Sequence, residues 1–366
     1  MTEAILLVGG YGTRLKPLTI HTPKPMLEVA GFPVTSHQIS KAKAAGINHI
    51  VLGTAFKSEV FHHGLGDGSA LGVKISYAFE PEQLGTGGGI RNAAELLTCG
   101  PEDPVVVFNG DVLTGVDIEK VLGIWKERKA DVALYLTKVD NPAAYGSVPT
   151  DGEGKVLAFL EKPARKEDIV TDQINAGMYV FKRKVIDTIA IGRVVSVERE
   201  VFPNLLKQGY KVIGIVDTGY WLDLGTPASF VQGSSDLVQG KIKTGLLNNF
   251  GDKLIQTGAK VSPTAKITEG TVIGINTVVE EECEINKSVI ANEVLISKGC
   301  KIESSIIATG SRIGQNCVIK NSVVADNVEL ANGSVLINDS RIWPDQKVER
   351  ITLENQTLPE NPDWGI

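Results

Sequence analysis

The spacing of apolar residues divides the chain into two parts. In the first part, up to residue 236, short aliphatic runs alternate with stretches that place apolar residues at helical intervals. The predicted elements are strands at residues 4–8, 49–53, 105–108 and 132–137 and helices at residues 33–45, 117–128 and 196–208. Such alternation is typical of an α/β domain with a Rossmann-like, mostly parallel sheet, whose ligands lie beyond the carboxyl ends of the strands.

In the second part, the aliphatic residues recur with a period of six. This ladder comprises Val261, Ile267, Ile273, Val279, Ile285, Ile290, Ile296, Ile302, Ile307, Ile313, Ile319, Val324, Leu330, Leu336 and Ile342. Where the step shortens to five, a turn has 17 residues instead of 18. A hexapeptide period predicts a left-handed parallel β-helix, with one face per hexad and the aliphatic side chains stacked inside.

Three of the four cysteines follow the same repeat. Cys283, Cys300 and Cys317 each lie two residues before a ladder position, so the alternation of a strand points them inward. We expect a stack of small, reduced thiols that continues with Ser334. A redox switch is the alternative function, but thiols buried among apolar groups are inert.

The change of period predicts the domain organisation. We expect a ligand-binding domain over residues 1–240, a connector over 241–258, the β-helix over 259–345 and a C-terminal tail over 346–366. A net charge of −6 gives no basic footprint for nucleic acid, and no apolar run approaches the length that a bilayer requires. The first residues lack the basic start of a signal peptide, and the cysteines lack zinc-type spacing. A cytoplasmic protein without nucleic-acid or membrane partners is predicted.

Candidate chemistry is concentrated after the first predicted strand. Gly9, Gly10 and Gly12 let the backbone turn sharply and present its N–H groups to anionic oxygens. Arg14 adds a guanidinium fork for phosphate, and Lys24 adds a point charge between two prolines. The segment lacks the Gly-Lys-Ser/Thr of a Walker A loop and the third glycine of a dinucleotide fingerprint. It predicts a cradle for a nucleoside triphosphate; the alternative is a glycine-rich turn followed by a solvated basic loop.

Other polar groups follow apolar runs further along the chain. Asp111 follows Asn109 and Gly110, where a carboxylate suits Mg²⁺, although an Asp in such a turn often only caps it. Residues 84–89 form a second glycine-rich stretch, predicted as a flexible turn beside a base or ribose or, alternatively, as an ordinary loop. Glu161 and Lys162 end the strand-like run at 156–160, where they suit sugar hydroxyls and a sugar phosphate; a surface charge pair is the alternative.

Taken together, these motifs resemble the signature of the sugar-1-phosphate nucleotidyltransferases. The matching pieces are GGYGTRLKPLT and PKPM in residues 9–26, LGTGG at 84–88, FNGD at 108–111, FLEKP at 159–163, INAG at 174–177 and YWLDLGTP at 220–227. Within that family the chain is most similar to bacterial GDP-mannose pyrophosphorylases that carry a hexapeptide-repeat tail. The resemblance covers nearly the whole chain.

The resemblance implies roles for individual residues. Those implied to bind the nucleotide are Leu7, Gly9, Gly10, Gly12, Thr13, Arg14, Lys24, Glu80, Gly85, Thr86, Asn109 and Gly110. Those implied to bind the sugar phosphate are Gly146, Glu161, Lys162 and Asn175, with Tyr145 as a further sugar contact. Asp111 and Asp223 are the implied Mg²⁺ ligands, and with Arg14, Lys24 and Lys162 they form the implied catalytic set. The implied substrates are GTP and mannose 1-phosphate.

Three alternatives remain open at this point. Glucose 1-phosphate with a thymidylyl, uridylyl or adenylyl donor is the rival within the class. A non-catalytic regulatory or scaffold subunit is the rival outside it, although a scaffold has no need of the five catalytic residues. Hexapeptide β-helices also occur in acyltransferases, but all five histidines lie at or before His63, so the repeat carries no histidine base. We therefore expect the β-helix to assemble a homo-oligomer or to regulate.

Overall fold

The computed structural model describes residues 1–160, 165, 167 and 169–359. The chain forms two compact units, and both are discontinuous in sequence. The sheet unit consists of Met1–Gly10 and Gln38–Trp221, and the β-helix unit consists of Tyr11–His37 and Leu222–Ile366. The glycine-rich segment therefore divides after Gly10, and most of it belongs to the β-helix unit. The predicted functional boundaries at 240, 258 and 345 stay predictions.

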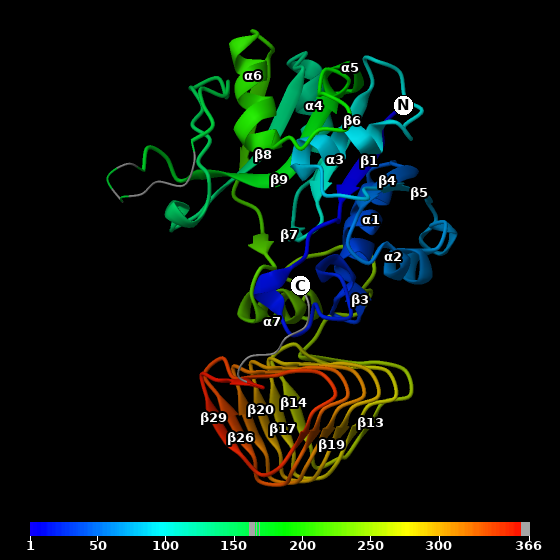
Figure 1. Ribbon diagram of the computed structural model, residues 1–366, viewed down its shortest axis with the longest axis vertical. Coiled ribbons are helices and arrows are strands. Elements are labelled where there is room, and N and C mark those ends of the chain that lie inside the picture. The colour runs from blue at the N-terminus through cyan, green and yellow to red at the C-terminus, as the bar shows by residue number, and fades with distance from the viewer. Residues whose placement is uncertain (161–164, 166, 168, 360–366) are drawn as a thin grey trace. The chain divides into compact units, whose positions relative to one another are not determined.

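A seven-stranded sheet forms the centre of the sheet unit (Figure 1). Its order is β10-β8-β9-β6-β1-β4-β5. The strands are β1 (Glu3–Leu7), β4 (His49–Thr54), β5 (Lys74–Phe79), β6 (Pro104–Asn109), β8 (Val132–Lys138), β9 (Gln173–Lys182) and β10 (Val212–Asp217). Neighbouring strands are parallel except at β9, which runs antiparallel to β6 and β8. The predicted Rossmann-like, mostly parallel sheet is confirmed.

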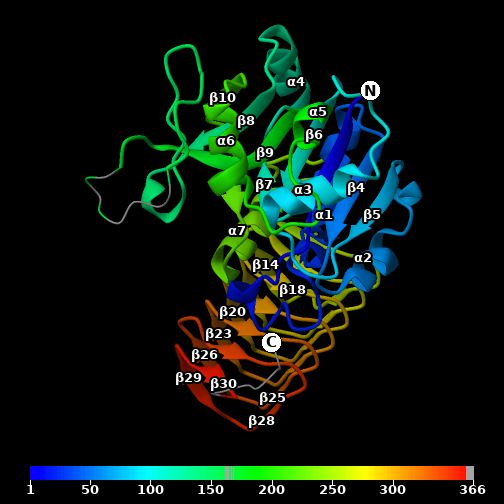
Figure 2. The same cartoon turned by 45° about the horizontal axis from the view of Figure 1, so that its top comes forward.

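Helices accompany the strands of the sheet, and the last helix along the chain belongs to the β-helix unit (Figure 2). The helices are α1 (Val34–Ala44), α2 (Ser58–Leu65), α3 (Gly85–Ala94), α4 (Ile118–Glu127), α5 (Arg183–Ile186), α6 (Phe202–Lys207) and α7 (Pro227–Val238). The predicted helix at 117–128 is α4, which starts because the Asp117 carboxylate accepts a hydrogen bond from the Lys120 amide at 3.0 Å. Its buried residues Ile118, Val121 and Trp125 recur at helical spacing. No helix in the described ranges is long and apolar enough to cross a membrane.

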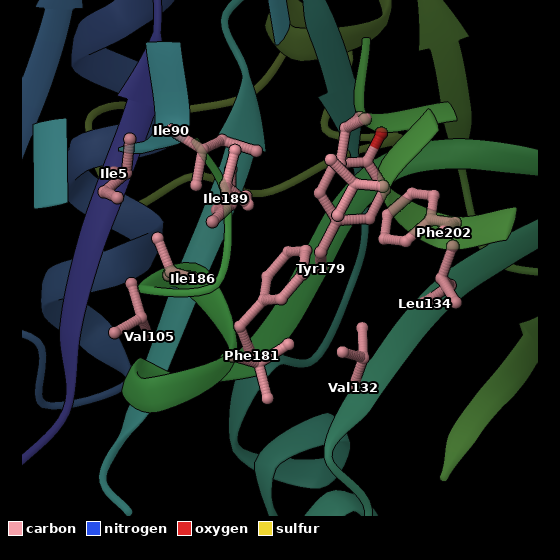
Figure 3. Packing of buried hydrophobic residues seen from close by; sticks show 14 of the residues in the cluster. Ile5, Ile90, Val105, Val132, Leu134, Tyr179, Phe181, Ile186, Ile189 and Phe202 are labelled. Carbon is pink, nitrogen blue, oxygen red and sulfur yellow. The ribbon is translucent and has the colours of Figure 1, made fainter. Parts of the chain in front are cut away.

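One hydrophobic cluster packs along a face of this sheet (Figure 3). Phe202 of α6 lies against two aromatic residues of β9, with ring centroids 5.1 Å from Tyr179 and 5.9 Å from Phe181. Ile5 of β1 and Ile90 of α3 are fully buried in the same cluster. The strands that present the polar site residues are thus anchored by a continuous core.

Three local predictions differ from the structure. Residues 84–89 are not a flexible turn: Gly85 begins helix α3, where close packing outweighs the poor helix propensity of glycine. The run at 156–160 is not a regular strand and makes only isolated bridges, Thr150 with Val156 and Ser147 with Leu160. The single helix expected at 196–208 is a π-helical turn, Val197–Val201, followed by α6, and the Ser196 side chain caps the turn by accepting from the Arg199 amide.

The β-helix consists of three parallel sheets (Figure 1). The first contains β12 (Lys253–Ile255), β15 (Thr271–Ile273), β18 (Val289–Ile290), β21 (Ile306–Ile307), β24 (Val323–Val324), β27 (Arg341–Ile342) and β30 (Thr357–Leu358). The second contains β13 (Lys260–Val261), β16 (Val278–Val279), β19 (Leu295–Ile296), β22 (Arg312–Ile313), β25 (Glu329–Leu330) and β28 (Lys347–Val348). The third contains β14 (Lys266–Thr268), β17 (Glu284–Asn286), β20 (Lys301–Glu303), β23 (Val318–Lys320), β26 (Val335–Ile337) and β29 (Thr352–Glu354).

The predicted aliphatic ladder forms the core of these coils. Ile285, Ile302, Ile319 and Leu336 stand in register on successive strands of the third sheet, and all are buried. Many coil corners adopt positive φ, which asparagine tolerates better than most residues, as at Asn316 (φ 56°). The architecture matches the expected left-handed β-helix.

The predicted cysteine stack is present inside the coils. Cys283, Cys300 and Cys317 are free and fully buried, and the Cys300 thiol donates to the Gly314 carbonyl oxygen at 3.0 Å. Hydrogen bonding along the stack and burial raise the pKa of Cys300. Ser334 follows in the stack and is equally buried. A buried neutral thiol is a packing residue, which agrees with the structural interpretation.

Before α1 begins at Val34, the segment Tyr11–His37 contains only short elements. They are the 3₁₀ turns η1 (Thr13–Leu15) and η2 (Lys24–Met26) and the antiparallel strands β2 (Glu28–Val29) and β3 (Phe32–Pro33). Long-range hydrogen bonds hold the segment within the β-helix unit: the Ala30 amide donates to Ser234 Oγ at 2.9 Å, and His37 Nδ1 lies 2.6 Å from Thr244 Oγ1. These two bonds span 204 and 207 residues of sequence.

Candidate functional site

Two predicted site segments follow adjacent strands of the sheet unit. Strands β1 and β6 are parallel neighbours, with Leu7 in register with Asn109. The Gly110 amide donates to the Leu7 carbonyl oxygen at 2.9 Å, and a Cβ on Gly110 would lie only 2.6 Å from that oxygen. Glycine is therefore required for this close approach. The two segments therefore start side by side at the carboxyl edge of the sheet.

Gln38, which the sequence did not single out, supports the turn that carries Asp111. Its side-chain amide donates to the carbonyl oxygens of Asn109 at 2.7 Å and Val112 at 3.1 Å, on either side of the half-buried Asp111. The side-chain carbonyl oxygen of Asn109 is buried and has no hydrogen-bond partner within the described structure. A fixed turn with an unsatisfied amide oxygen is suited to receive polar groups of a ligand.

Glu80 lies at the start of the second glycine-rich stretch. Its Oε2 accepts a hydrogen bond from the Leu84 amide at 3.0 Å, and a Cβ on Gly89 would lie 2.8 Å from its Oε1. Burial raises the pKa of the Glu80 carboxyl group. The same stretch reaches the first glycine-rich segment, because the Gln83 amide donates to the Gly9 carbonyl oxygen at 2.8 Å. Glu80 is thus a buried carboxylate placed between two backbone turns.

The first turn of α3, which contains the predicted nucleotide contacts Gly85 and Thr86, is held by hydrogen bonds within the protein. The Gly87 and Gly88 amides donate to the Val195 carbonyl oxygen at 2.8 and 3.2 Å. The Thr86 hydroxyl donates to Glu198 Oε2 at 3.0 Å and accepts from the Val197 amide at 2.8 Å. These bonds anchor the first turn of the helix. The assignment of Gly85 and Thr86 to nucleotide binding stays a prediction.

The predicted sugar residues lie around β9. Asn175 is on this strand; its amide donates to the Tyr179 hydroxyl at 2.6 Å, and its Oδ1 accepts from the Gly177 amide at 3.0 Å. Gly146 precedes Ser147, which bridges to Leu160 and to Ile174 at the start of β9. The Tyr145 ring meets Trp221 edge to face, with centroids 5.5 Å apart. Glu161 and Lys162 lie outside the described residues.

Three predicted catalytic residues come together in the β-helix unit. Arg14 Nη2 and Lys24 Nζ each lie 3.6 Å from an oxygen of Asp223, which ends strand β11 (Trp221–Asp223). A Cβ on Gly225 would lie 2.7 Å from the Arg14 guanidinium, so this glycine leaves room for it. Gly12, at φ 62°, has the same function for Lys24, whose Cβ would lie 2.8 Å from an added Cβ. Thr13, also implied to bind the nucleotide, begins the turn η1 that carries Arg14.

Burial differs sharply between the two cations. The Lys24 side chain is 9% exposed, whereas that of Arg14 is 65% exposed. Asp223 Oδ1 is buried and has no hydrogen-bond partner among the described atoms, since Lys24 Nζ lies beyond hydrogen-bond range. A carboxylate oxygen that is buried and unsatisfied costs free energy unless a cation or donor occupies its free lone pairs. Asp223 is therefore suited to act as a metal ligand.

The side chains at the site suit a metal ion whose remaining ligands come from the substrate. No group of three or more His, Cys, Asp or Glu side chains arranged for metal binding exists among the residues that the structure describes. Mg²⁺ binds through one or two carboxylates together with phosphate oxygens and water, so it does not require such a cluster. The residues present thus fit Mg²⁺ bound together with a nucleotide.

Comparisons with known proteins agree with the motifs. The chain matches the family model described as "Nucleotidyl transferase" over residues 3–240 and the model described as "GMPPB C-terminal domain" over residues 249–358. It is 51% identical over 294 residues to a mannose-1-phosphate guanylyltransferase from Mycobacterium tuberculosis, and the alignment covers 80% of this chain and 80% of the relative. The resemblance drawn from the motifs is confirmed.

Two solved structures are each similar to 64% of the chain. HddC from Yersinia pseudotuberculosis, complexed with GMP-PN, has a TM-score of 0.55 and 27% identity, over 64% of this chain and 99% of that chain. A putative glucose-1-phosphate thymidylyltransferase from Bacillus anthracis, in complex with a sucrose, has a TM-score of 0.57 and 25% identity, over 64% of this chain and 94% of that chain.

Proposed function

Because this chain belongs to the nucleotidyl transferase family, we propose that it transfers a guanylyl group from GTP to mannose 1-phosphate. A phosphate oxygen of the sugar 1-phosphate attacks the α-phosphorus of GTP in line. The new bond joins that oxygen to phosphorus, the bond between the α-phosphorus and its bridging oxygen breaks, and pyrophosphate leaves. The product is GDP-mannose. The attacking oxygen is ionised at neutral pH, so catalysis consists of positioning and charge stabilisation.

The observation that carries this proposal is the cluster of Arg14, Lys24 and Asp223. A buried lysine and an accessible guanidinium beside a glycine-rich turn form a cationic site for a triphosphate. We assign Arg14 to the triphosphate and Lys24 to the phosphates nearest the reacting phosphorus. A non-catalytic scaffold subunit would not require a lysine here whose side chain is only 9% exposed, because lysine is seldom buried.

A divalent cation completes the charge balance. Asp223 and Asp111 are the carboxylates proposed to hold Mg²⁺, Asp223 because of its buried, unsatisfied oxygen and Asp111 because of its place at the end of β6. When bound, the ion neutralises phosphate charge in the transition state. The choice of these two residues as Mg²⁺ ligands rests on their residue type and on the family motif.

The sugar phosphate is assigned to Lys162 and the sugar hydroxyls to Glu161, Asn175 and Gly146. Asn175 is held by Tyr179, so its amide is oriented before substrate binds. Such orientation lowers the entropic cost of placing the attacking oxygen. These roles rest on the family motif.

Glu80 is the residue proposed to select the base. A carboxylate accepts hydrogen bonds from the ring N–H and the exocyclic amine of guanine, whereas adenine offers no donor pair of this kind. The Glu80 carboxylate is buried, and a buried acceptor left without a donor carries a large penalty, which discriminates among bases. The name of the mycobacterial relative and the GMP-PN bound by HddC support guanine and mannose.

The substrate pair is tested by scoring pyrophosphate release from GTP, ATP, UTP and dTTP, each with mannose 1-phosphate and glucose 1-phosphate. We expect GTP with mannose 1-phosphate to exceed every other pair by at least about tenfold in kcat/KM, or about 1.4 kcal/mol. Faster turnover of dTTP with glucose 1-phosphate would replace the proposal with its rival, for which the Bacillus anthracis structure is the precedent. No turnover of any pair would favour a regulatory subunit.

The variant Glu80→Gln tests the role of Glu80 in base selection with the same assay. Glutamine keeps an oxygen that can accept from the Leu84 amide, so the helix start is preserved, but it loses the charge. The preference for GTP over ATP should fall by about tenfold, while the KM for mannose 1-phosphate stays constant. Glu82→Gln, two residues away and exposed, is the matched control. An unchanged base preference in Glu80→Gln would rule out its role in base selection.

The metal assignment is tested with Asp111→Asn and Asp223→Asn. Each should lower kcat by about 100-fold or more at saturating Mg²⁺, and excess chelator should abolish the activity of the wild type. Asp172→Asn serves as control, because the Asp172 carboxylate is exposed and pairs with Lys138 at the surface. Wild-type kcat in either site variant would show that its carboxylate is not a ligand.

A further inference from the structure

A side chain of the β-helix holds the backbone of the phosphate-binding turn. Arg341, the first residue of β27, directs its guanidinium at this turn, which lies within the same unit. Its Nη1 donates to the carbonyl oxygen of Lys16 at 2.6 Å and to that of Arg14 at 3.2 Å. The contact joins residues 325 positions apart along the chain.

The orientation of Arg341 is set by Asp339. Arg341 Nε donates to Asp339 Oδ1 and Arg341 Nη2 donates to Asp339 Oδ2, both at 3.0 Å. This paired, charge-assisted geometry fixes the plane of the guanidinium and leaves Nη1 for the turn. The Arg341 side chain is 22% exposed, so it is largely shielded from competing water.

The hydrogen bonds within the turn leave these two carbonyl groups available to Arg341. Within the turn, the Leu15 amide donates to Gly12 and the Lys16 amide donates to Thr13. The carbonyl oxygens of Arg14 and Lys16 take no part in these two hydrogen bonds. Arg341 therefore supplies the hydrogen bonds that fix the backbone from which the Arg14 side chain extends toward Asp223.

Arg341 differs from the other cations along the coils. The exposed lysine pairs of the β-helix join neighbouring coils: Lys266–Glu284, Lys298–Glu282, Lys301–Glu284, Lys320–Glu303 and Lys347–Glu329. Such pairs contribute little to stability. Arg341 instead forms an ion pair with Asp339 in its own coil, and its Nη1 donates hydrogen bonds to the glycine-rich segment.

From this geometry we propose that Arg341, oriented by Asp339, is a positioning residue for the triphosphate-binding turn. The inference rests on the proposed function and deepens it. Arg341 touches no substrate; it holds the main chain of Arg14 and Lys16 so that the Arg14 guanidinium stays beside Asp223. The β-helix then serves catalysis within its own chain, in addition to any assembly of subunits.

The proposal is tested with Arg341→Ala and Arg341→Lys, with Arg312→Ala as the matched control. Arg312 also begins a two-residue strand of the coils, but it is exposed. Arg341→Ala should raise the KM for GTP about tenfold or more, since two charge-assisted bonds are lost, and should change the KM for mannose 1-phosphate less than about twofold. Arg341→Lys should recover part of the loss, because an ammonium group can reach a carbonyl but cannot form the paired contact with Asp339.

A second measurement separates this inference from the proposed function. Hydrogen exchange of amides in residues 11–18 needs no substrate, and it should be faster in Arg341→Ala than in the wild type and in Arg312→Ala, with exchange in the coils unchanged. If the wild type turns over no nucleotide pair, the proposed function fails, and the exchange result alone decides whether Arg341 holds the turn. Unchanged exchange, or equal rises in both KM values, would overturn the positioning role.

Discussion

Acidification should destabilise the β-helix unit through one buried histidine. His37 is 1% exposed, and its Nε2 lies 2.9 Å from the Val29 carbonyl oxygen. A carbonyl only accepts, so Nε2 carries the proton and Nδ1 accepts from the Thr244 hydroxyl. Protonation of Nδ1 removes that acceptor and places a charge in the interior. Burial accordingly lowers the pKa of His37 to about 4, against the opposing effect of its hydrogen bond to Val29.

The size and pH range of the effect follow from linkage. The folded-state pKa is about 4, and the ordinary value is 6.5. The unfolded chain therefore gains a proton first as the pH falls, so stability is lost between pH 6.5 and pH 4. The difference of 2.5 pKa units corresponds to about 3 kcal/mol at 1.36 kcal/mol per unit. Above pH 6.5 the histidine makes no pH-dependent contribution.

Urea unfolding at pH 7 and pH 4 measures this effect in the wild type and in His37→Gln. Glutamine can donate to Val29 and accept from Thr244 without titrating, so the variant should lose about 3 kcal/mol less on acidification than the wild type. Glu28 and Asp326, whose pKa values burial raises, remain in both proteins and cancel in the difference. His63→Gln, an exposed change, should leave the wild-type behaviour intact. Equal pH dependence of wild type and His37→Gln would refute the argument.

Four further outcomes are expected. Lys162→Ala should raise the KM for sugar 1-phosphate much more than that for GTP in steady-state assays, and equal effects on the two would contradict its assignment. The Cys300 stack should not react with a thiol reagent until the protein unfolds, because the thiols are buried; rapid labelling of the native protein would contradict this. Burial raises the pKa of Glu3, but hydrogen bonds with His49, Thr98 and Cys99 outweigh it and lower the pKa to about 2. The contribution of Glu3 to stability should therefore be complete above pH 4.5 and be lost as the pH falls toward 2. Thermal melts over this pH range measure the loss, and Glu3→Gln should show a weaker dependence of stability on pH. If the β-helix assembles subunits, truncation near Gly240 should change the number of subunits per particle, obtained from the mass measured by light scattering. An unchanged number of subunits in a folded fragment would count against that role.

The candidate catalytic residues could be proposed from the sequence because their signals are local. The turn after β1, the Asn109–Asp111 turn and the Asp223 motif are short stretches whose residue types carry the chemistry, and two of them follow strands that an apolar run identifies. The carboxyl ends of parallel strands share an edge, so the place of Asp111 followed from the pattern. The approach of Arg14 and Lys24 to Asp223 did not, because about two hundred residues separate Asp223 from both basic residues and no spacing encodes their distance.

The sequence alone determined the β-helix most completely. Its period is six residues, each coil repeats the last, and an inward position is specified by its immediate neighbours, as the register of Ile302 with Ile319 shows. Tertiary structure decided the features in which distant segments meet. Helix α3 forms from a glycine run because Val195 and Glu80 satisfy its first amides, and Arg341 acquires its partners only when the coils bring it to the turn at residues 14–16. Periodicity describes which face of an element is buried, whereas the choice of the segment that covers that face depends on packing across the whole chain.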